Sequence, residues 1–147
     1  MRAMPEFVFM KLWLDDVRKP PDDSWTWCKS VEEALKIADK CEEWALDHDL
    51  GGQLAHYGKG EYDFTAPTGA DFIRWYCRDA RITKGRQVLP PKVSIHSTNL
   101  PGVRTMVDML CQWSVGAELD IDIIVRPMRG FIMDRTPYHY PALRIKA

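Results

Sequence analysis

The sequence predicts an α/β fold built on a five-stranded parallel sheet of order 2-1-3-4-5, with helices on both faces and a shortened first helix. Two observations lead to this prediction. Short apolar runs, each suited to one buried strand, alternate with segments of helical periodicity along the 147 residues. Four of these runs end in charged or hydroxyl residues, which the carboxyl edge of a parallel sheet would bring together.

Length and composition indicate one globular domain over residues 1–147, with a core at about 7–130 and a C-terminal extension at 131–147. Hydrophobic residues make up 46% of the chain and charged residues 28%. The net charge of −1 predicts no general affinity for nucleic acid or membranes. Signal-peptide, membrane-span and Cys-x-x-Cys patterns are lacking, so we expect a cytoplasmic protein with buried free thiols.

The first half of the chain predicts two strands, a helix and a third strand. Apolar, aromatic and β-branched runs predict the strands. The segment after the first strand is too short and proline-rich for a full helix. Ser30, with Glu33 three residues later, forms a capping box that starts the helix. The expected elements are strand Phe7–Leu14, strand Trp25–Cys28, helix Val31–Lys40 and strand Glu43–Leu46.

The second half begins with a long glycine-containing loop over Gly51–Pro67, a length typical of functional loops. Thr68 can cap a following helix, Pro90-Pro91 breaks the chain, and Pro101 suits the first turn of another helix. The tail over Met128–Ala147 predicts no element. The expected elements are helix Gly69–Ala80, strand Lys92–Ile95, a helix from Pro101 through Leu110 and strand Ile121–Val125.

The polar ends of four predicted strands define the candidate site. In a flavodoxin-like order, strands one, three, four and five are consecutive neighbours, so their polar ends should converge. An acidic pair, a further aspartate, a hydroxyl and a cation can together hold a divalent metal and a phosphoryl group. The four ends are Asp15-Asp16, Asp47-His48-Asp49, His96-Ser97 and Arg126-Pro127.

These motifs resemble the receiver domain of two-component response regulators over roughly residues 7–130. That family has an acidic pair after strand one, a phosphoacceptor Asp after strand three, a Ser or Thr after strand four and a Lys-Pro after strand five. The matching positions are Asp15 and Asp16, Asp47, Ser97 and Arg126-Pro127. Arg126 stands where the family has Lys, and it would grip phosphate oxygens rather than deliver a proton.

A narrower resemblance rests on Asp-Asp-Val-Arg, Leu-Asp-His-Asp-Leu-Gly and His-Ser-x-Asn. This set is similar to the receiver-like family named for predicted cyclic-phosphate processing, which is found in bacteria and phages. The resemblance implies an activity on cyclic phosphates.

Asp15, Asp16 and Asp47 are the predicted ligands of one Mg²⁺ or Mn²⁺ ion. Mg²⁺ typically takes one or two carboxylates and keeps waters, which leaves room for phosphate oxygens. Clustered carboxylates repel one another, and this favours a bound cation. The alternative is a solvated acidic pair at a strand end.

Asp47 has two functional interpretations: a nucleophile that forms an aspartyl phosphate, or a metal ligand that helps to activate water. Asp49, His48 and His96 are each candidates to move a proton, although either histidine could be structural. Haloacid-dehalogenase-type phosphatases also have a second Asp two residues after the nucleophile, but their acidic pair comes late in the chain. The early acidic pair here favours the receiver interpretation.

Ser97, Arg126, Arg18 and Asn99 are candidates to bind phosphate oxygens, and Lys59 in the long loop is a further one. Ser97 and Asn99 could instead cap the helix that follows them. The two roles can coexist, because anions bind at helix N-termini.

The leading hypothesis is a Mg²⁺- or Mn²⁺-dependent phosphoesterase that acts on a cyclic phosphate of a nucleotide or an RNA end. One alternative is a stand-alone receiver-like signalling module phosphorylated on Asp47. The other is a catalytically inactive protein that binds a nucleotide phosphate. The expected partner is a phosphate-ester small molecule or an RNA end, whereas the signalling module would be read by a further partner.

Overall fold

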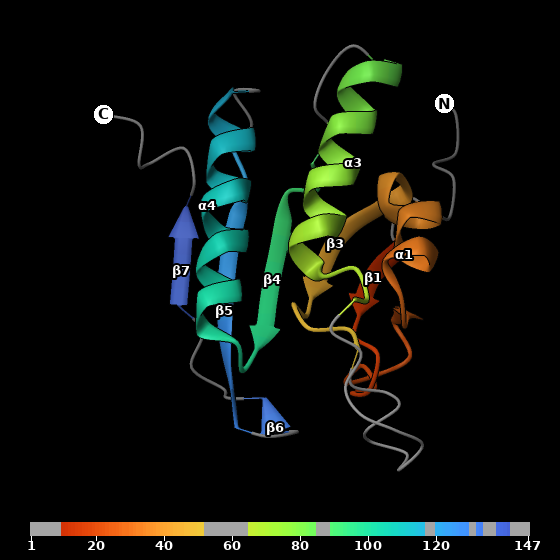
Figure 1. Cartoon of the computed structure of the whole chain (residues 1–147), viewed down its shortest axis with the longest axis vertical. Coiled ribbons are helices and arrows are strands. Elements are labelled where there is room, and N and C mark those ends of the chain that lie inside the picture. Colours follow the sequence, from red (N-terminus) through yellow and green to blue (C-terminus); the bar gives the residue numbers. More distant parts are fainter. Residues whose placement is uncertain are drawn as a thin grey trace, which may run out of the picture.

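The computed structural model describes residues 10–51, 65–84, 89–116, 120–129, 132–133 and 138–141. Its parallel strands follow the order β2-β1-β3-β4-β5 (Figure 1), which confirms the predicted fold class and strand order. Phe7–Phe9 and most of the loop Gly51–Pro67 lie outside the described residues. The strands are β1 (Met10–Leu14), β2 (Trp25–Cys28), β3 (Cys41–Leu46), β4 (Lys92–Ser97) and β5 (Asp122–Arg129).

The helices begin at the predicted caps. Ser30 Oγ accepts a hydrogen bond from the backbone N–H of Glu33 at 3.2 Å. The backbone N–H of Asp71 donates to Thr68 Oγ1 at 3.2 Å, and the Asp71 carboxylate accepts from the N–H of Thr68 at 2.9 Å. This pair is a reciprocal capping box. The helices are α1 (Val31–Ile37), which continues into the 3₁₀ turn η2 (Ala38–Lys40), α3 (Gly69–Lys84) and α4 (Leu100–Gly116).

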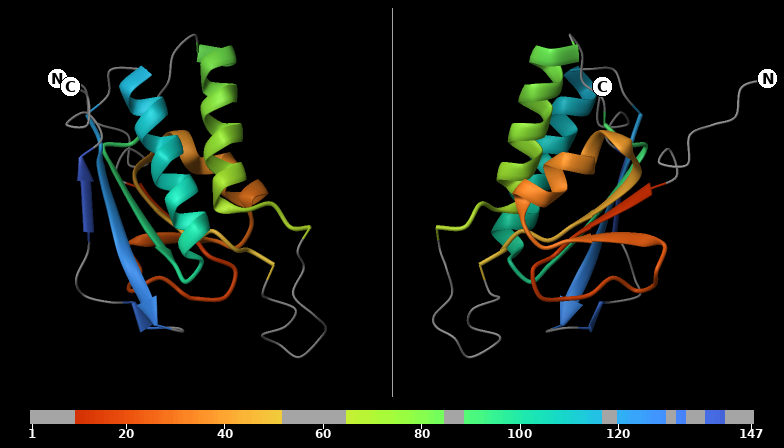
Figure 2. Two further views of the ribbon diagram at one scale, coloured as in Figure 1. Left: turned by 60° about the vertical axis from the view of Figure 1, so that its left-hand side comes forward. Right: turned by 90° about the vertical axis from the view of Figure 1, so that its right-hand side faces the viewer.

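The three α-helices of the described residues lie on one face of the sheet (Figure 2), whereas the sequence predicted helices on both faces. Connections between parallel strands are right-handed. The helical connections from β2 to β3, β3 to β4 and β4 to β5 all step in the same direction across the sheet, so they share a face. The β1–β2 connection steps the other way, and it is the short segment without a helix.

The hydrophobic core lies between the sheet and this helical layer. Alternate strand residues point toward the helices, as the pleat requires. Their neighbours Trp13, Ala45, Ser94, His96 and Ile124 are also buried but belong to the other face. The largest buried side chains of the core include Trp44, Phe72, Leu12, Leu14, Leu46, Ile73, Ile95, Met106, Leu110 and Ile123.

Part of the C-terminal extension joins the sheet, although the sequence predicted no element there. β7 (Tyr138–Pro141) runs antiparallel to β5 and pairs with Asp122–Val125, and β6 (Ile132–Met133) pairs with the end of β5. β5 itself extends beyond the predicted end at Val125. Proline is confined to edge strands, so a proline-containing tail predicts no strand until its pairing with an edge is known.

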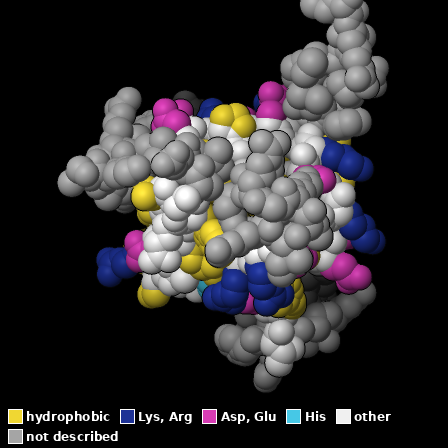
Figure 3. All heavy atoms as spheres, turned by 90° about the horizontal axis from the view of Figure 1, so that it is seen from above, with side chains coloured by type: hydrophobic (Ala, Val, Ile, Leu, Met, Phe, Trp, Pro, Cys, Tyr) yellow, Lys and Arg dark blue, Asp and Glu magenta, His cyan; other side chains and the backbone are white. Residues whose placement is uncertain are grey.

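The surface at the amino ends of the parallel strands carries both signs of charge. Lys and Arg side chains are interspersed there with Asp and Glu (Figure 3), as the net charge of −1 leads one to expect. Within the described ranges, none of the helices combines the length and the apolar character that a membrane span requires.

Candidate metal and phosphate site

Strand register aligns the predicted site residues in one row across the sheet. Leu46 of β3 pairs with Leu14 of β1 on one side and with Ile95 of β4 on the other. The backbone N–H of Asp47 donates to the carbonyl of Leu14 at 2.8 Å and so extends this ladder. The next residues on the four strands are Asp15, Asp47, His96 and Arg126, of which the last two pair directly. Arg126 thus lies at the predicted edge, but inside β5 rather than after it.

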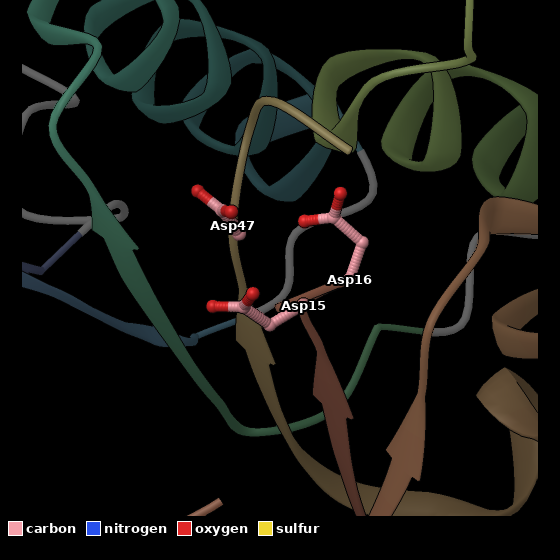
Figure 4. Close-up of side chains that lie close together, drawn as sticks. All are labelled: Asp15, Asp16 and Asp47. Atoms are coloured by element: carbon pink, nitrogen blue, oxygen red, sulfur yellow. The ribbon is translucent and has the colours of Figure 1, made fainter. Parts of the chain in front are cut away.

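Asp15, Asp16 and Asp47 form an acidic cluster at the carboxyl ends of β1 and β3. One oxygen of each carboxylate lies within 4.8 Å of the others, and the three side chains gather around a common space (Figure 4). Their exposed fractions are 0%, 3% and 3%. β1 ends at Leu14, so strand alternation does not separate the adjacent Asp15 and Asp16. Buried carboxylates this close together are stabilised by a nearby cation or by protonation of one of them.

The pKa values of the cluster reflect this crowding. Burial and then the charge of Asp15 raise the pKa of Asp47 to about 8, while Arg18 and the N–H of His48 act in the opposite direction. Burial also acts to raise the pKa of Asp15, but hydrogen bonds from His96 and two backbone amides outweigh it and hold that pKa below its ordinary value. A divalent cation would keep all three groups ionised, and three carboxylates are a donor set that suits Mg²⁺ or Mn²⁺.

A tight turn after β1 takes the place of the usual first helix and holds Asp15. Its Oδ1 accepts hydrogen bonds from the backbone N–H groups of Val17 at 2.9 Å and Arg18 at 2.8 Å. The indole Nε1 of Trp13 donates to the carbonyl of Arg18, and that of Trp27 donates to the carbonyl of Asp15, both at 2.7 Å. Two tryptophans therefore fix the main chain of the turn that carries the acidic pair.

The His96 side chain contacts the carboxylate of Asp15. The ring is fully buried, its Nε2 lies 3.1 Å from Asp15 Oδ2, and it stacks on Trp13 with a centroid separation of 4.1 Å and an interplanar angle of 13°. Burial lowers the pKa of His96 despite the nearby carboxylate, so we treat the ring as neutral with Nε2–H donating to Asp15. Within the described part of the chain, its Nδ1 has no hydrogen-bond partner. A ring without exposed surface is poorly placed to exchange a proton with a substrate.

Arg18, a predicted phosphate ligand, lies against the acidic cluster. Its Nη1 is 3.5 Å from Asp15 Oδ2 and 3.5 Å from Asp47 Oδ2. Arg126, the other predicted cation, takes part in none of the ion pairs found among the described residues. The structure therefore places Arg18, rather than Arg126, in contact with the carboxylates.

A second group of polar side chains, the histidine cluster, consists of His48, Asp49 and Asn99. His48 Nδ1 lies 2.6 Å from Asp49 Oδ1, which also accepts from Asn99 Nδ2 at 2.9 Å. With Nδ1–H donating to Asp49, the Nε2 of His48 is the ring atom that can accept or deliver a proton. The exposed side-chain fractions of His48 and Asp49 are 16% and 40%. This cluster is thus in contact with solvent.

Asn99 and Ser97 also have the structural role that the sequence offered as an alternative. Asn99 caps α4, since its Oδ1 accepts from the N–H of Gly102 at 3.0 Å. Ser97 Oγ accepts from the N–H of Asn99 at 3.1 Å. A Cβ at Gly102 would lie 2.5 Å from the ring of His48, so glycine is what lets the imidazole pack against the first turn of α4. Their capping role is compatible with phosphate binding at the same helix end.

Sequence reasoning missed four residues that shape the site. Trp13 and Trp27 hold the turn, and Gly69 and Gly102 admit the backbone of Asp47 and the ring of His48. The glycines carried a usable signal, because each stands in the first turn of a helix, where glycine lowers helix stability and often marks a close approach. The remaining candidate, Lys59, lies outside the described residues.

The fold and the acidic cluster together define a receiver-like domain. The family model described as the cyclic-phosphate processing receiver domain matches residues 10–112, and the chain belongs to this family. The match spans β1 to most of α4 and does not include Arg126 on β5. Comparisons with curated proteins and with solved structures gave no significant match.

Proposed function

We propose that the protein is a Mg²⁺- or Mn²⁺-dependent phosphoesterase that opens a cyclic phosphate of a nucleotide or an RNA end. The observation that carries this proposal is the convergence of three buried carboxylates within 4.8 Å at the sheet edge. Membership of the cyclic-phosphate processing receiver family supports the choice of substrate class. The histidine cluster adds proton-transfer groups that a plain phosphoacceptor does not need.

Asp15, Asp16 and Asp47 would hold the metal ion. When bound, Mg²⁺ or Mn²⁺ offsets the negative charge that develops on the phosphate oxygens. Ser97 and Asn99, at the N-terminus of α4, and Arg126, in register with His96, would bind and orient the phosphate.

The reaction replaces one ester bond. A water oxygen, or the carboxylate of Asp47, attacks phosphorus while one ring P–O bond breaks, and the leaving oxygen takes up a proton. The product is a linear phosphomonoester. If Asp47 attacks, water then hydrolyses the aspartyl phosphate. His48 and Asp49 are assigned the proton transfers, because they are paired and reached by solvent.

The test is turnover of a panel of 2′,3′-cyclic, 3′,5′-cyclic and linear phosphates with Mg²⁺ or Mn²⁺. We expect one cyclic class to be opened, and we expect Asp47→Asn and Asp15→Asn each to lower kcat/KM by about 10³-fold or more. Asp108→Asn, at an exposed position on α4, is the matched control. Turnover that survives both cluster substitutions would refute the proposal.

The second candidate is a receiver-like signalling module phosphorylated on Asp47. It is favoured by the position of Asp47 directly after β3, where receiver domains carry their phosphoacceptor. Acetyl phosphate with Mg²⁺ would then give a stable adduct of about 80 Da, one phosphoryl group, that is lost in Asp47→Asn. Tight nucleotide-phosphate binding with neither turnover nor adduct would instead support an inactive binder.

A further inference from the structure

The guanidinium of Arg18 bridges two of the three carboxylates of the acidic cluster. Its Nη1 is 3.5 Å from Asp15 Oδ2 and 3.5 Å from Asp47 Oδ2. The two carboxylate groups belong to different strands, so the arginine joins the ends of β1 and β3. Its side chain is 16% exposed, and ion pairs with so little solvent contact are screened less than surface pairs.

The position of Arg18 is built into the turn. Its backbone N–H donates to Asp15 Oδ1 at 2.8 Å, and its carbonyl accepts from the indole of Trp13 at 2.7 Å. Hydrogen bonds to both the N–H and the carbonyl of Arg18 therefore fix its main chain next to the acidic cluster. Lys19, the next residue, is exposed and carries the same charge without making an ion pair to the cluster.

A divalent cation and this guanidinium would compete for the carboxylates of Asp15 and Asp47. Each of the three aspartates offers one ligand atom within 4.8 Å of the others, and Arg18 lies against the carboxylates of two of them. Two cations this close repel each other strongly where little water screens them. Binding of a metal ion must therefore weaken or break the contacts of Arg18.

We propose that Arg18 is an internal counter-ion, which neutralises the acidic cluster when no metal is bound and is displaced by the metal to bind the substrate's phosphate. The counter-ion role depends only on the contacts of Arg18, and the phosphate-binding role rests on the proposed function. A displaced guanidinium stays within reach of the site, because the turn fixes its backbone. Arginine then offers two parallel N–H groups to a pair of phosphate oxygens.

The first test is calorimetric titration of the full chain with Mn²⁺ alone. Arg18→Gln removes the competing charge, so we expect the Kd for Mn²⁺ to fall by about threefold to tenfold. Lys19→Gln, which removes the same charge from the neighbouring residue, should change the Kd by less than about twofold. An unchanged or weaker affinity in Arg18→Gln would overturn the proposal.

Arg18→Lys is a second variant, which keeps the test possible if Arg18→Gln does not fold. Lysine keeps the charge but lacks the planar fork of the guanidinium, so the Kd for Mn²⁺ should fall by a smaller factor than in Arg18→Gln. Thermal melting with EDTA shows whether each variant is folded. If only the lysine variant folds, an affinity equal to or weaker than that of the parent protein overturns the proposal.

The second test separates metal binding from substrate binding. With saturating Mn²⁺, Arg18→Gln should raise KM for the substrate by about tenfold, although it binds the metal more tightly. If Arg18→Gln binds Mn²⁺ more tightly but its KM is unchanged, the phosphate-binding role of Arg18 is refuted and its counter-ion role stands. Because the calorimetric test needs no turnover, failure of the proposed phosphoesterase activity is distinguished from failure of the counter-ion role.

Discussion

The acidic cluster and the histidine cluster occupy the same edge of the sheet, but the second is far more exposed to solvent. Asp15 and Asp47 have side-chain exposures of 0% and 5%, whereas that of Asp49 is 40%. In the acidic cluster, carboxylates are crowded, and a partly buried arginine and a fully buried histidine lie against them. In the histidine cluster, the polar atoms of three side chains satisfy one another.

This difference indicates a division of labour between the clusters. Charges that are out of contact with water interact strongly with a cation, because the surroundings screen them little. Groups that water reaches can exchange protons with solvent between turnovers. The aspartates of the first cluster thus suit metal binding, whereas the histidine and aspartate of the second suit proton transfer.

The largest difference between the clusters should appear in turnover. Asp47→Asn is expected to lower kcat/KM by about 10³-fold and to weaken Mn²⁺ binding, because it removes a proposed metal ligand. His48→Gln should cost about 10²-fold in kcat/KM and leave the Kd for Mn²⁺ within about twofold, since it removes only the proposed proton-transfer group. Steady-state kinetics and calorimetry on both variants make the comparison. A similar loss of Mn²⁺ affinity in Asp47→Asn and His48→Gln would contradict the proposed division of roles between the two clusters.

Two glycines allow a comparison of how rigidly each cluster is packed. A Cβ at Gly69 would lie 2.1 Å from the carbonyl oxygen of Asp47, and one at Gly102 would lie 2.5 Å from the His48 ring. Because a backbone cannot move aside as a side chain can, Gly69→Ala should cost about 3 kcal/mol of unfolding free energy and Gly102→Ala about 1–2 kcal/mol. Chemical denaturation measures both values.

Gly116→Ala is the matched control for these two substitutions. A Cβ at Gly116 meets no atom of the described residues within 4 Å, so alanine at the end of α4 should be neutral or stabilise the protein by up to about 1 kcal/mol. A loss at Gly102 greater than that at Gly69 would reverse the inferred order of rigidity.

His96 should affect the acidic cluster through Asp15. His96→Leu removes the Nε2–H that donates to Asp15, and we expect it to weaken Mn²⁺ binding by about tenfold. His96→Gln retains an amide donor and should recover most of that affinity. Calorimetry with Mn²⁺, together with melting temperatures, separates this effect from a loss of packing on Trp13. Equal affinities in the parent and both variants would show that His96 does not position the ligand.

The smallest expected effect is a pH dependence of stability in the metal-free protein. The pKa of Asp47 is raised from 3.8 to about 8, so between these values the folded protein binds a proton that the unfolded chain has lost. The stability contributed by this group is therefore complete below about pH 4 and is lost as the pH rises through about 8. Bound Mg²⁺ opposes this loss, because it favours the ionised carboxylate.

Melting temperatures between pH 5 and 9, with EDTA and with Mg²⁺, measure this dependence. The gap between the two curves should widen toward high pH. Asp47→Asn should flatten the metal-free curve, since it removes the titrating group. A gap that narrows toward high pH would contradict the sign of the effect.

Local signals in the sequence predicted most of the sheet and the acidic cluster. Apolar runs located the five parallel strands, and capping residues located the starts of α1 and α3. Asp15, Asp16 and Asp47 were identifiable because each follows an apolar run whose neighbours in the sheet were inferred from the strand order. The placement of all three helices on one face could also have been derived from that order and the right-handed crossover rule.

The β6 and β7 pairings could not be predicted, because a short proline-containing strand depends on the edge it meets rather than on its own periodicity. The roles of the two histidines were open for a similar reason. His48 and His96 each follow an aspartate or an apolar run, and only the packing shows that one is half-buried on Gly102 and the other fully buried on Trp13.

The sequence by itself determined which polar residues reach the carboxyl edge, since strand order and the two-residue pleat follow from the pattern of apolar runs. Only the tertiary structure decided how those residues divide between a buried cluster and a solvated one, and which arginine contacts the carboxylates. Burial and the distances between charges are properties of the packed chain. The same aspartate can have its pKa raised or lowered according to the neighbours that folding brings to it.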